Sequence, residues 1–287
     1  MASMDAVAGA EPRARAEARG PLVYRHSLVA RVTHWVFTLA FFILVMSGLQ
    51  IFNASPNLDA SDKSDPSRRV LAIGAIQSPG GKPVGITQIF GLQFTTTHLL
   101  GYTSDGMDGE TERAFPGWIT LPGYQDLAGG RRWHLFFAWI MVLCGAAYFI
   151  GGVTSKDFAL IVLRPSDLPK LLPMQLYYLR LRPEPPPHGK YNPLQKAAYT
   201  SVLFVFAPLM VLSGLALSPG VDALAHPLTT LLGGRQFARL WHFVATLALV
   251  GFFGVHLTLV LSTGVLNNLR SMITGEYRLG AHDGNGV

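Results

Sequence analysis

Four long apolar segments constrain this chain more than any other feature of its sequence. They are "THWVFTLAFFILVMSGLQIF" (33–52), "WHLFFAWIMVLCGAAYFIGG" (133–152), "AAYTSVLFVFAPLMVLSGLAL" (197–217) and "FARLWHFVATLALVGFFGVHLTLVLS" (237–262). About 20 helical residues cross a hydrocarbon core that is about 30 Å thick. Within lipid only helices or closed barrels satisfy the backbone, and these segments lack the strict alternation of barrel strands. The sequence therefore predicts an all-α membrane protein, a bundle of four transmembrane helices.

The composition agrees with a membrane location. Of the 287 residues, 49% are hydrophobic and 14% are charged, whereas about a quarter of the residues of a soluble domain are charged. The formal net charge is +6, but the cationic residues flank the apolar segments, which is typical of membrane anchoring. Membrane lipid is therefore an expected partner, and nucleic acid is not. A single cysteine, Cys144, excludes disulfides within the chain, thiolate zinc sites and iron–sulfur clusters.

The distribution of lysine and arginine predicts the orientation. One side of the membrane, which holds both termini and the 153–196 connection, carries 14 of the 23 Lys and Arg residues. The 53–132 connection on the other side carries seven, and eight acidic residues offset them. Because cytoplasmic loops carry the excess of Lys and Arg, we expect a multi-pass protein with both termini in the cytoplasm.

The segments between the spans predict the domain organisation. Residues 1–21 and 279–287 are expected to be tails, the first of them disordered, around one membrane domain at 22–278. The 53–132 connection is rich in Gly, Pro, Ser, Thr and Asp. Since loops of this length are usually functional or disordered, we expect a long periplasmic loop that folds as a cap and meets a partner. The cytoplasmic 153–196 loop is expected to hold a short helix on the membrane surface.

Four of the nine histidines lie in or at the ends of the spans: His34, His134, His242 and His256. An imidazole within a membrane is costly unless it is paired or ligated, although any one of them can also be a satisfied core histidine. His242 and His256 are 14 residues apart, which is about 40° short of four helical turns and about 21 Å along the axis. The two therefore share one face of a helix at two different depths.

The alternating direction of the helices sorts the four histidines into two layers. His34 and His256 are expected on the cytoplasmic side, and His134 and His242 on the periplasmic side. Two layers with two axial imidazoles each are what two bis-histidine haems b require. No span contains Asp or Glu, which disfavours zinc, di-iron and proton-pump interpretations.

Two glycines extend the haem hypothesis. Gly48 lies 14 residues after His34, and Gly214 lies in the third span within "VLSGL", an echo of "VMSGL" in the first. A glycine at these depths would let a porphyrin approach the backbone, so both are candidate cofactor-binding residues. Small residues in membrane helices also serve helix packing alone, and both interpretations remain open.

The chain resembles the bacterial cytochrome b561 and nickel–iron hydrogenase cytochrome b superfamily, which includes cytochrome b subunits of formate dehydrogenase and thiosulfate reductase. The resemblance covers residues 22–278 and is carried by "HSLVARVTHW", "GRRWHLFFAW", "YNPLQKAAY", the "WH" and "H" of the fourth span, and "RSMITGEY". It implies that His34, His134, His242 and His256 are the axial ligands of two haems b. It also implies an inner-membrane subunit that exchanges electrons with quinone and a periplasmic or cytoplasmic oxidoreductase partner, in similar proteins a molybdopterin enzyme.

The expected function is therefore electron transfer across the membrane between the quinone pool and a partner oxidoreductase. The subunit itself would at most oxidise or reduce quinone, and Asn192 and Lys196 of "YNPLQK" are one candidate quinone site. Two alternatives remain open: a membrane anchor with one haem or none, and a stand-alone quinol-dependent reductase or oxidase. The sequence does not define the partner's substrate, the direction of electron flow or the haem potentials.

Overall fold

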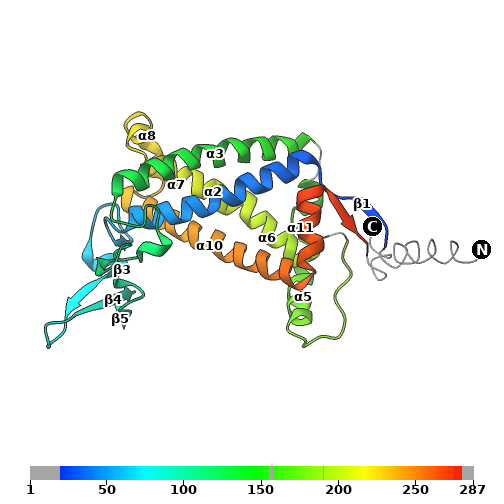
Figure 1. The fold of residues 1–287 in the computed structure, drawn as a ribbon. Helices are drawn as coiled ribbons and strands as arrows, with labels where there is room; N and C mark the ends of the chain where they lie inside the picture. Colours follow the sequence, from blue (N-terminus) through cyan, green and yellow to red (C-terminus); the bar gives the residue numbers. More distant parts are fainter. Residues whose placement is uncertain (1–19, 155–157, 190, 280–287) are drawn as a thin grey trace, which may run out of the picture. The chain divides into compact units, whose positions relative to one another are not determined.

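A computed structural model describes residues 20–154, 158–189 and 191–279 (Figure 1). In these residues four helices are long and apolar enough to cross a membrane, at Leu28–Phe52 (α2), Leu127–Thr154 (α3), Pro193–Leu217 and Arg235–Ser262 (α10). The four predicted spans lie within these helices. The chain is thus a multi-pass helical membrane protein, as the sequence predicts. The tail predicted at 1–21 lies almost entirely outside the described residues, as does the second tail beyond Leu279.

The third spanning helix is irregular in its middle. It runs as α6 (Pro193–Ser201), a π-helical stretch (η4, Val202–Phe206) and α7 (Ala207–Leu217). Pro208 lies in the first turn of α7. A proline has no N–H to donate to the preceding turn, and a π-bulge is one way in which a helix accommodates such a defect.

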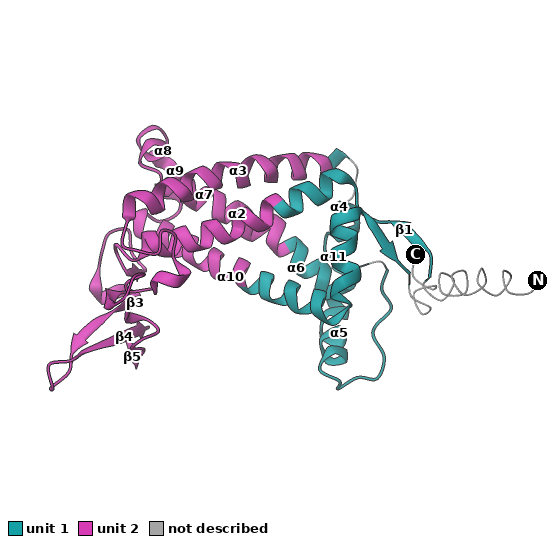
Figure 2. Ribbon diagram, in the orientation of Figure 1, with its two compact units in different colours: residues 1–35, 153–200, 251–287 teal, residues 36–152, 201–250 magenta. Residues whose placement is uncertain are grey.

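The chain divides into two compact units, coloured separately in Figure 2. The cap-side unit holds residues 36–152 and 201–250, and the terminal-side unit holds residues 1–35, 153–200 and 251–287. The cap-side unit also contains two short helices between α7 and α10, α8 (Pro219–Leu224) and α9 (His226–Leu231).

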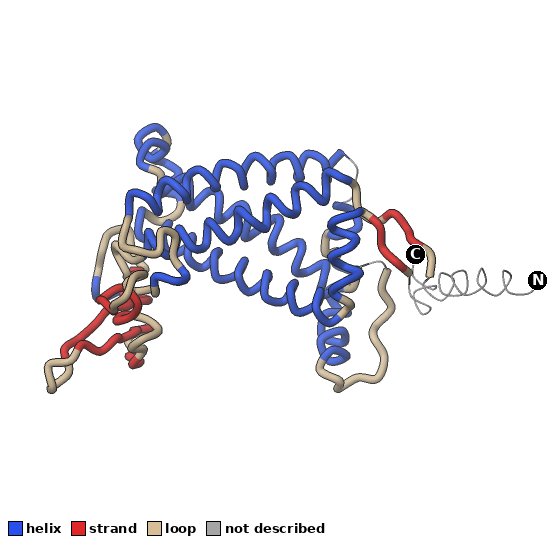
Figure 3. The backbone as a smooth tube through the Cα atoms, in the orientation of Figure 1, coloured by secondary structure: helices blue, strands red, loops and turns tan. Residues whose placement is uncertain are grey.

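The prediction of an all-α protein is wrong for the connection between α2 and α3, residues 53–126, here called the cap (Figure 3). An antiparallel sheet of four strands has the order β2-β3-β4-β5, and β6 pairs with β7. Two short 3-10 turns, η1 (Pro66–Arg68) and η2 (Gly117–Ile119), complete the cap. The strands are β2 (Asn57–Asp59), β3 (Arg69–Gln77), β4 (Pro83–Ile89), β5 (Leu92–Thr95), β6 (Gly101–Ser104) and β7 (Glu110–Arg113). The glycines and prolines that suggest a loop lie largely at the turns between strands, where such residues are favoured.

Buried polar contacts join the cap to the end of α2. The guanidinium of Arg113, a residue only 3% exposed, donates to Oε1 of Gln50 and to Oγ1 of Thr120, each at 3.0 Å. Asn53 forms two hydrogen bonds with the backbone of Phe115, at 2.7 and 3.2 Å. Because a buried polar group without a partner is costly, these contacts hold the cap in a defined position on α2.

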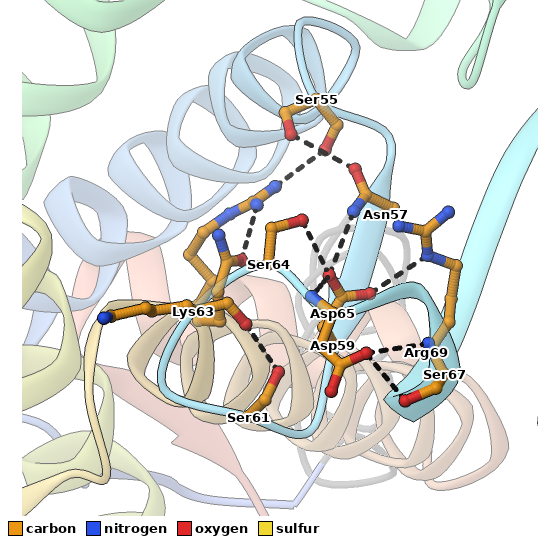
Figure 4. A network of polar contacts seen from close by, with 11 residues as sticks. Ser55, Asn57, Asp59, Ser61, Lys63, Ser64, Asp65, Ser67 and Arg69 are labelled. Atoms are coloured by element: carbon orange, nitrogen blue, oxygen red, sulfur yellow. Dashed lines mark hydrogen bonds and ion pairs between the residues drawn. The ribbon is translucent and has the colours of Figure 1, made fainter.

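A carboxylate network orders the first segment of the cap (Figure 4). The buried carboxylate of Asp59 accepts hydrogen bonds from Nε of Arg69 (3.0 Å), the backbone N–H of Asp65 (3.0 Å) and Oγ of Ser64 (3.1 Å). Burial alone would raise the pKa of Asp59, but these hydrogen bonds and the charge of Arg69 outweigh it and hold the pKa below its ordinary value. The network therefore depends on an ionised Asp59.

The terminal-side unit contains the beginning of α2 and the end of α10. Strand β1 (Leu22–Tyr24) pairs antiparallel with β8 (Glu276–Arg278), so both ends of the described chain meet in one ribbon. The 153–196 connection contains α4 (Phe158–Ile161), a 3-10 helix η3 (Pro165–Lys170) and α5 (Leu171–Tyr178). Helix α11 (Val265–Thr274) follows α10 after Gly264, which has a positive φ of 100°.

Candidate haem-binding sites

The structure brings the four histidines of the spans together in two pairs. In the cap-side unit the ring centroids of His134 (α3) and His242 (α10) are 6.1 Å apart, with an interplanar angle of 62°. In the terminal-side unit those of His34 (α2) and His256 (α10) are 6.4 Å apart, with an angle of 55°. These are the partners that the sequence predicts. We call them the cap-side pair and the terminal-side pair.

The hydrogen bonds of His134 define which of its nitrogens carries the proton. Oγ of Ser47 donates its hydrogen to the carbonyl of Ile43 at 2.6 Å. Oγ of Ser47 also lies 3.1 Å from Nδ1 of His134. The carbonyl oxygen of Leu44 lies 3.2 Å from the same Nδ1. A carbonyl only accepts, and the serine hydrogen is already donated, so Nδ1 must be the N–H donor. Nε2 of His134 is then unprotonated, which is the form that binds a metal.

His242 is held in the same way by a different helix. Oγ of Ser213 (α7) donates to the carbonyl of Leu209 at 2.6 Å and lies 3.0 Å from Nδ1 of His242. Nδ1 of His242 must therefore donate to this oxygen, and its Nε2 is also unprotonated. Ser47 and Ser213 are both fully buried. In the neutral form of each imidazole of the cap-side pair, Nε2 is thus the nitrogen available as a ligand.

The two candidate glycines lie against these same imidazoles. A Cβ on Gly48 would be 3.3 Å from Cε1 and 3.6 Å from Nδ1 of His134. A Cβ on Gly214 would be 3.3 Å from Cε1 and 3.7 Å from Nδ1 of His242. Both glycines therefore make room for a histidine ring, a neighbour that the spacing argument does not name. That a porphyrin also approaches here stays a prediction.

The terminal-side pair is surrounded by aromatic rings. The rings of Trp35 and His34 are nearly perpendicular, with an interplanar angle of 88° and centroids 5.2 Å apart. Phe252 stacks on His256, with centroids 6.3 Å apart and an interplanar angle of 20°. The indole N–H of Trp35 donates to the carbonyl of Met272 at 3.1 Å, which connects α2 to α11. Aromatic neighbours are compatible with a flat apolar cofactor between the rings.

The separation of the rings suits an iron in each pair. Two metal–imidazole bonds of about 2 Å, plus about 1 Å from each nitrogen to its ring centre, place two axial imidazoles about 6 Å apart. The observed 6.1 and 6.4 Å agree with this value. In residues 20–154, 158–189 and 191–279, no three His, Cys, Asp or Glu side chains are grouped to hold an ion. The donor set therefore fits haem, whose porphyrin supplies the other four ligands.

Three arginines at the beginnings of the spanning helices have backbone partners. Arg239 donates to the carbonyl of Ser55 at 2.7 Å and Arg235 to that of Leu217 at 3.3 Å. Arg31 donates to the carbonyl of Ile273. These bonds connect helix ends to neighbouring segments.

The other two histidines of the cap-side unit, His98 and His226, have ordinary surface contacts. Nδ1 of His98 lies 2.6 Å from Glu110, and Nδ1 of His226 lies 3.1 Å from Asp222, with both imidazoles more than 70% exposed. Asn192 and Lys196, the candidate quinone residues, also have structural partners. Asn192 donates to the hydroxyl of Tyr178 at 3.1 Å, and Lys196 forms an ion pair with Asp167 at 3.1 Å.

This fold and these histidine pairs are those expected of a membrane cytochrome, and comparison with known proteins identifies the family of the chain. The model of the prokaryotic cytochrome b561 family matches residues 25–275, so the chain belongs to that family. It is 31% identical over 255 residues to a protein of Azospira oryzae named as a putative protein-methionine-sulfoxide reductase subunit, YedZ1. That match covers 86% of this chain and 93% of the relative. The chain is therefore a membrane electron-transfer protein of this family, and membership implies that it binds haem b.

Proposed function

We propose that this protein is a dihaem cytochrome b that carries electrons across the bacterial inner membrane between quinone and a partner oxidoreductase. One haem would lie between His134 and His242, and the other between His34 and His256. The observation that carries the proposal is the occurrence of two histidine pairs with ring centroids 6.1 and 6.4 Å apart. In the cap-side pair, hydrogen bonds also leave both Nε2 atoms unprotonated.

The protein's contribution is to hold the ligands and to exclude water. A bound haem b supplies a one-electron couple between ferrous and ferric iron. Two histidines at each site would hold one haem and would leave no open coordination site for substrate. Ser47 and Ser213 fix the orientation of the cap-side imidazoles, and Trp35 and Phe252 pack against the terminal-side ones. Such sites transfer electrons and leave substrate chemistry to another protein.

The partner is proposed to dock on the cap or on the opposite face. The cap is folded and joined to α2 by Gln50, Asn53 and Arg113, so a protein bound there would lie close to the helix that carries Ser47 and Gly48. The Azospira oryzae relative is named as a reductase subunit. A catalytic subunit that reduces methionine sulfoxide is therefore the first partner to test, and a molybdopterin enzyme is its expected class. Both termini are proposed to be cytoplasmic.

Haem stoichiometry tests the proposal. The full chain is purified, and haem is quantified as the pyridine haemochrome. Two haems b per chain are expected, falling to about one in His134→Ala and in His34→Ala because each removes one ligand from one site. His98→Ala is the matched control, since this exposed histidine contacts Glu110 and should leave the count at two. Folded wild-type protein with no haem would instead indicate a plain membrane anchor.

A further inference from the structure

The cap-side pair is supported by two copies of one short sequence. "VMSGL" (45–49) and "VLSGL" (211–215) lie on α2 and α7, and each places its serine and glycine against one histidine. In both cases the histidine belongs to the next long helix along the chain, α3 or α10. The corresponding distances agree closely: 3.1 and 3.0 Å from Oγ to Nδ1, and 3.3 Å from Cε1 to the position that a Cβ would take on either glycine.

We infer that Ser47 and Ser213 are positioning residues that lower the reduction potential of the cap-side haem, by accepting the Nδ1 hydrogen of both its axial ligands. The inference rests on the proposed function, because it requires a haem between His134 and His242. It adds an electronic role for two residues that contact the ligands and not the iron.

The chemistry follows from a relay of two hydrogen bonds on each side. Nδ1–H of the histidine donates to Oγ of the serine, which donates to a carbonyl one turn earlier, at 2.6 Å in both copies. Donation by Oγ polarises it and makes it a better acceptor. An acceptor at Nδ1 raises the basicity of the ligating nitrogen. A more basic imidazole stabilises ferric over ferrous iron, so two such ligands together lower the potential.

The glycine that follows each serine also supports this hydrogen bond. With 3.3 Å between the ring carbon and a Cβ at Gly48 or Gly214, any side chain there would push the ring away from the serine. The serine supplies the acceptor, and the following glycine lets the ring edge reach it. The terminal-side pair has aromatic neighbours: the rings of Trp35 and His34 are nearly perpendicular, and Phe252 stacks on His256.

The test is a spectroelectrochemical titration of the full chain with Ser47 and Ser213 both replaced, first by alanine and then by cysteine. Alanine removes the serine acceptor and leaves the carbonyl of Leu44 as the other acceptor near Nδ1 of His134, while cysteine keeps most of the volume but is a weak acceptor. At a fixed potential we expect the reduced-to-oxidised ratio of the cap-side haem to rise about tenfold in both variants, which is about 59 mV for one electron. Ser262→Ala is the control, because Ser262 also bonds a carbonyl of its own helix, that of Leu259.

The results of this titration test the role of the two serines independently of the proposed dihaem function. Equal upward shifts in the alanine and cysteine variants, with two haems retained and the other haem unchanged, support it. An unchanged ratio, or a shift in alanine that cysteine reverses, overturns it, since packing would then explain the effect. Both of those results leave the dihaem cytochrome intact. Fewer than two haems in the wild-type chain contradict the proposed function itself.

Discussion

Gly48→Ala is predicted to weaken the cap-side haem site by moving one ligand. The new Cβ would lie 3.3 Å from Cε1 of His134, whereas carbon atoms in good contact are about 3.5–4.0 Å apart. The imidazole must therefore retreat by a few tenths of an ångström, and the 3.1 Å contact between its Nδ1 and Ser47 opens with it. Overpacking of this kind costs about 1–3 kcal/mol.

This cost should appear as lost haem affinity, since the proposed function makes the displaced ring a haem ligand. At about 1.4 kcal/mol per factor of ten, the expected loss is about fivefold to over a hundredfold. The assay is transfer of haem from the reconstituted protein to an excess of apomyoglobin, followed as two kinetic phases. The faster phase should accelerate in Gly48→Ala and equally in Gly214→Ala, which faces the same contact with His242 at 3.3 Å.

Gly145→Ala is the matched control, because Gly145 is also a glycine within a spanning helix but a Cβ there would have no atom within 4 Å. It accounts for the general gain in helix stability that alanine brings over glycine. Equal haem transfer from Gly48→Ala and Gly145→Ala would refute the reasoning, because the ring would then not depend on the missing side chain.

The remaining predictions concern the cap and the terminal-side unit. Asp59→Asn should destabilise the cap by about 2 kcal/mol. The cost is smaller than for a fully buried ion pair because the Arg69 side chain is 26% exposed. Faster amide exchange in residues 57–77 would show this loss, and Asp62→Asn, at an exposed position, is the control. The pKa of Asp59 is lower in the folded protein than its ordinary value of 3.8. Asp59 should therefore stabilise the cap fully at a pH above 3.8 and lose this contribution as the pH falls through its folded pKa. The Asp59→Asn variant should not show this dependence on pH. Lys196→Met should increase amide exchange in residues 164–170 by breaking the ion pair with Asp167, while haem content stays at two. A fall in haem content would contradict this purely structural role.

The helical part of the fold can be predicted because a lipid bilayer permits few backbone structures. Length and continuous apolarity locate the spans, and the predicted boundaries differ from the observed ones by a few residues. The helices extend beyond the apolar segments: α2 begins at Leu28 and α3 at Leu127. Polar residues such as Arg31 and Arg131 continue a helix without belonging to its hydrophobic stretch, so hydropathy underestimates the length.

The strands of the cap escape prediction for a different reason. The longest of them, "RVLAIGAIQ" (69–77), is apolar without clear alternation, because most of its side chains are partly buried on both faces. Such a strand has no distinctive period. The turn-rich segments around it favour a loop, although two strands separated by "SPGGK" are what a hairpin requires.

The environment of the two serines could not be predicted from helical spacing alone. Helical spacing predicts the face and depth of Gly48 relative to His34, but it does not say which neighbouring helix covers that face. The structure places His134 there, and the second "SGL" has the same relation to His242. A serine–glycine step in a membrane helix is common, so one copy carries little information. Two copies, each followed by a histidine on the next long helix, are a signal that the sequence already contains. The echo reflects a histidine pair with two similar supporting helices, and a search for repeated helix pairs in related chains would test whether the two halves vary together.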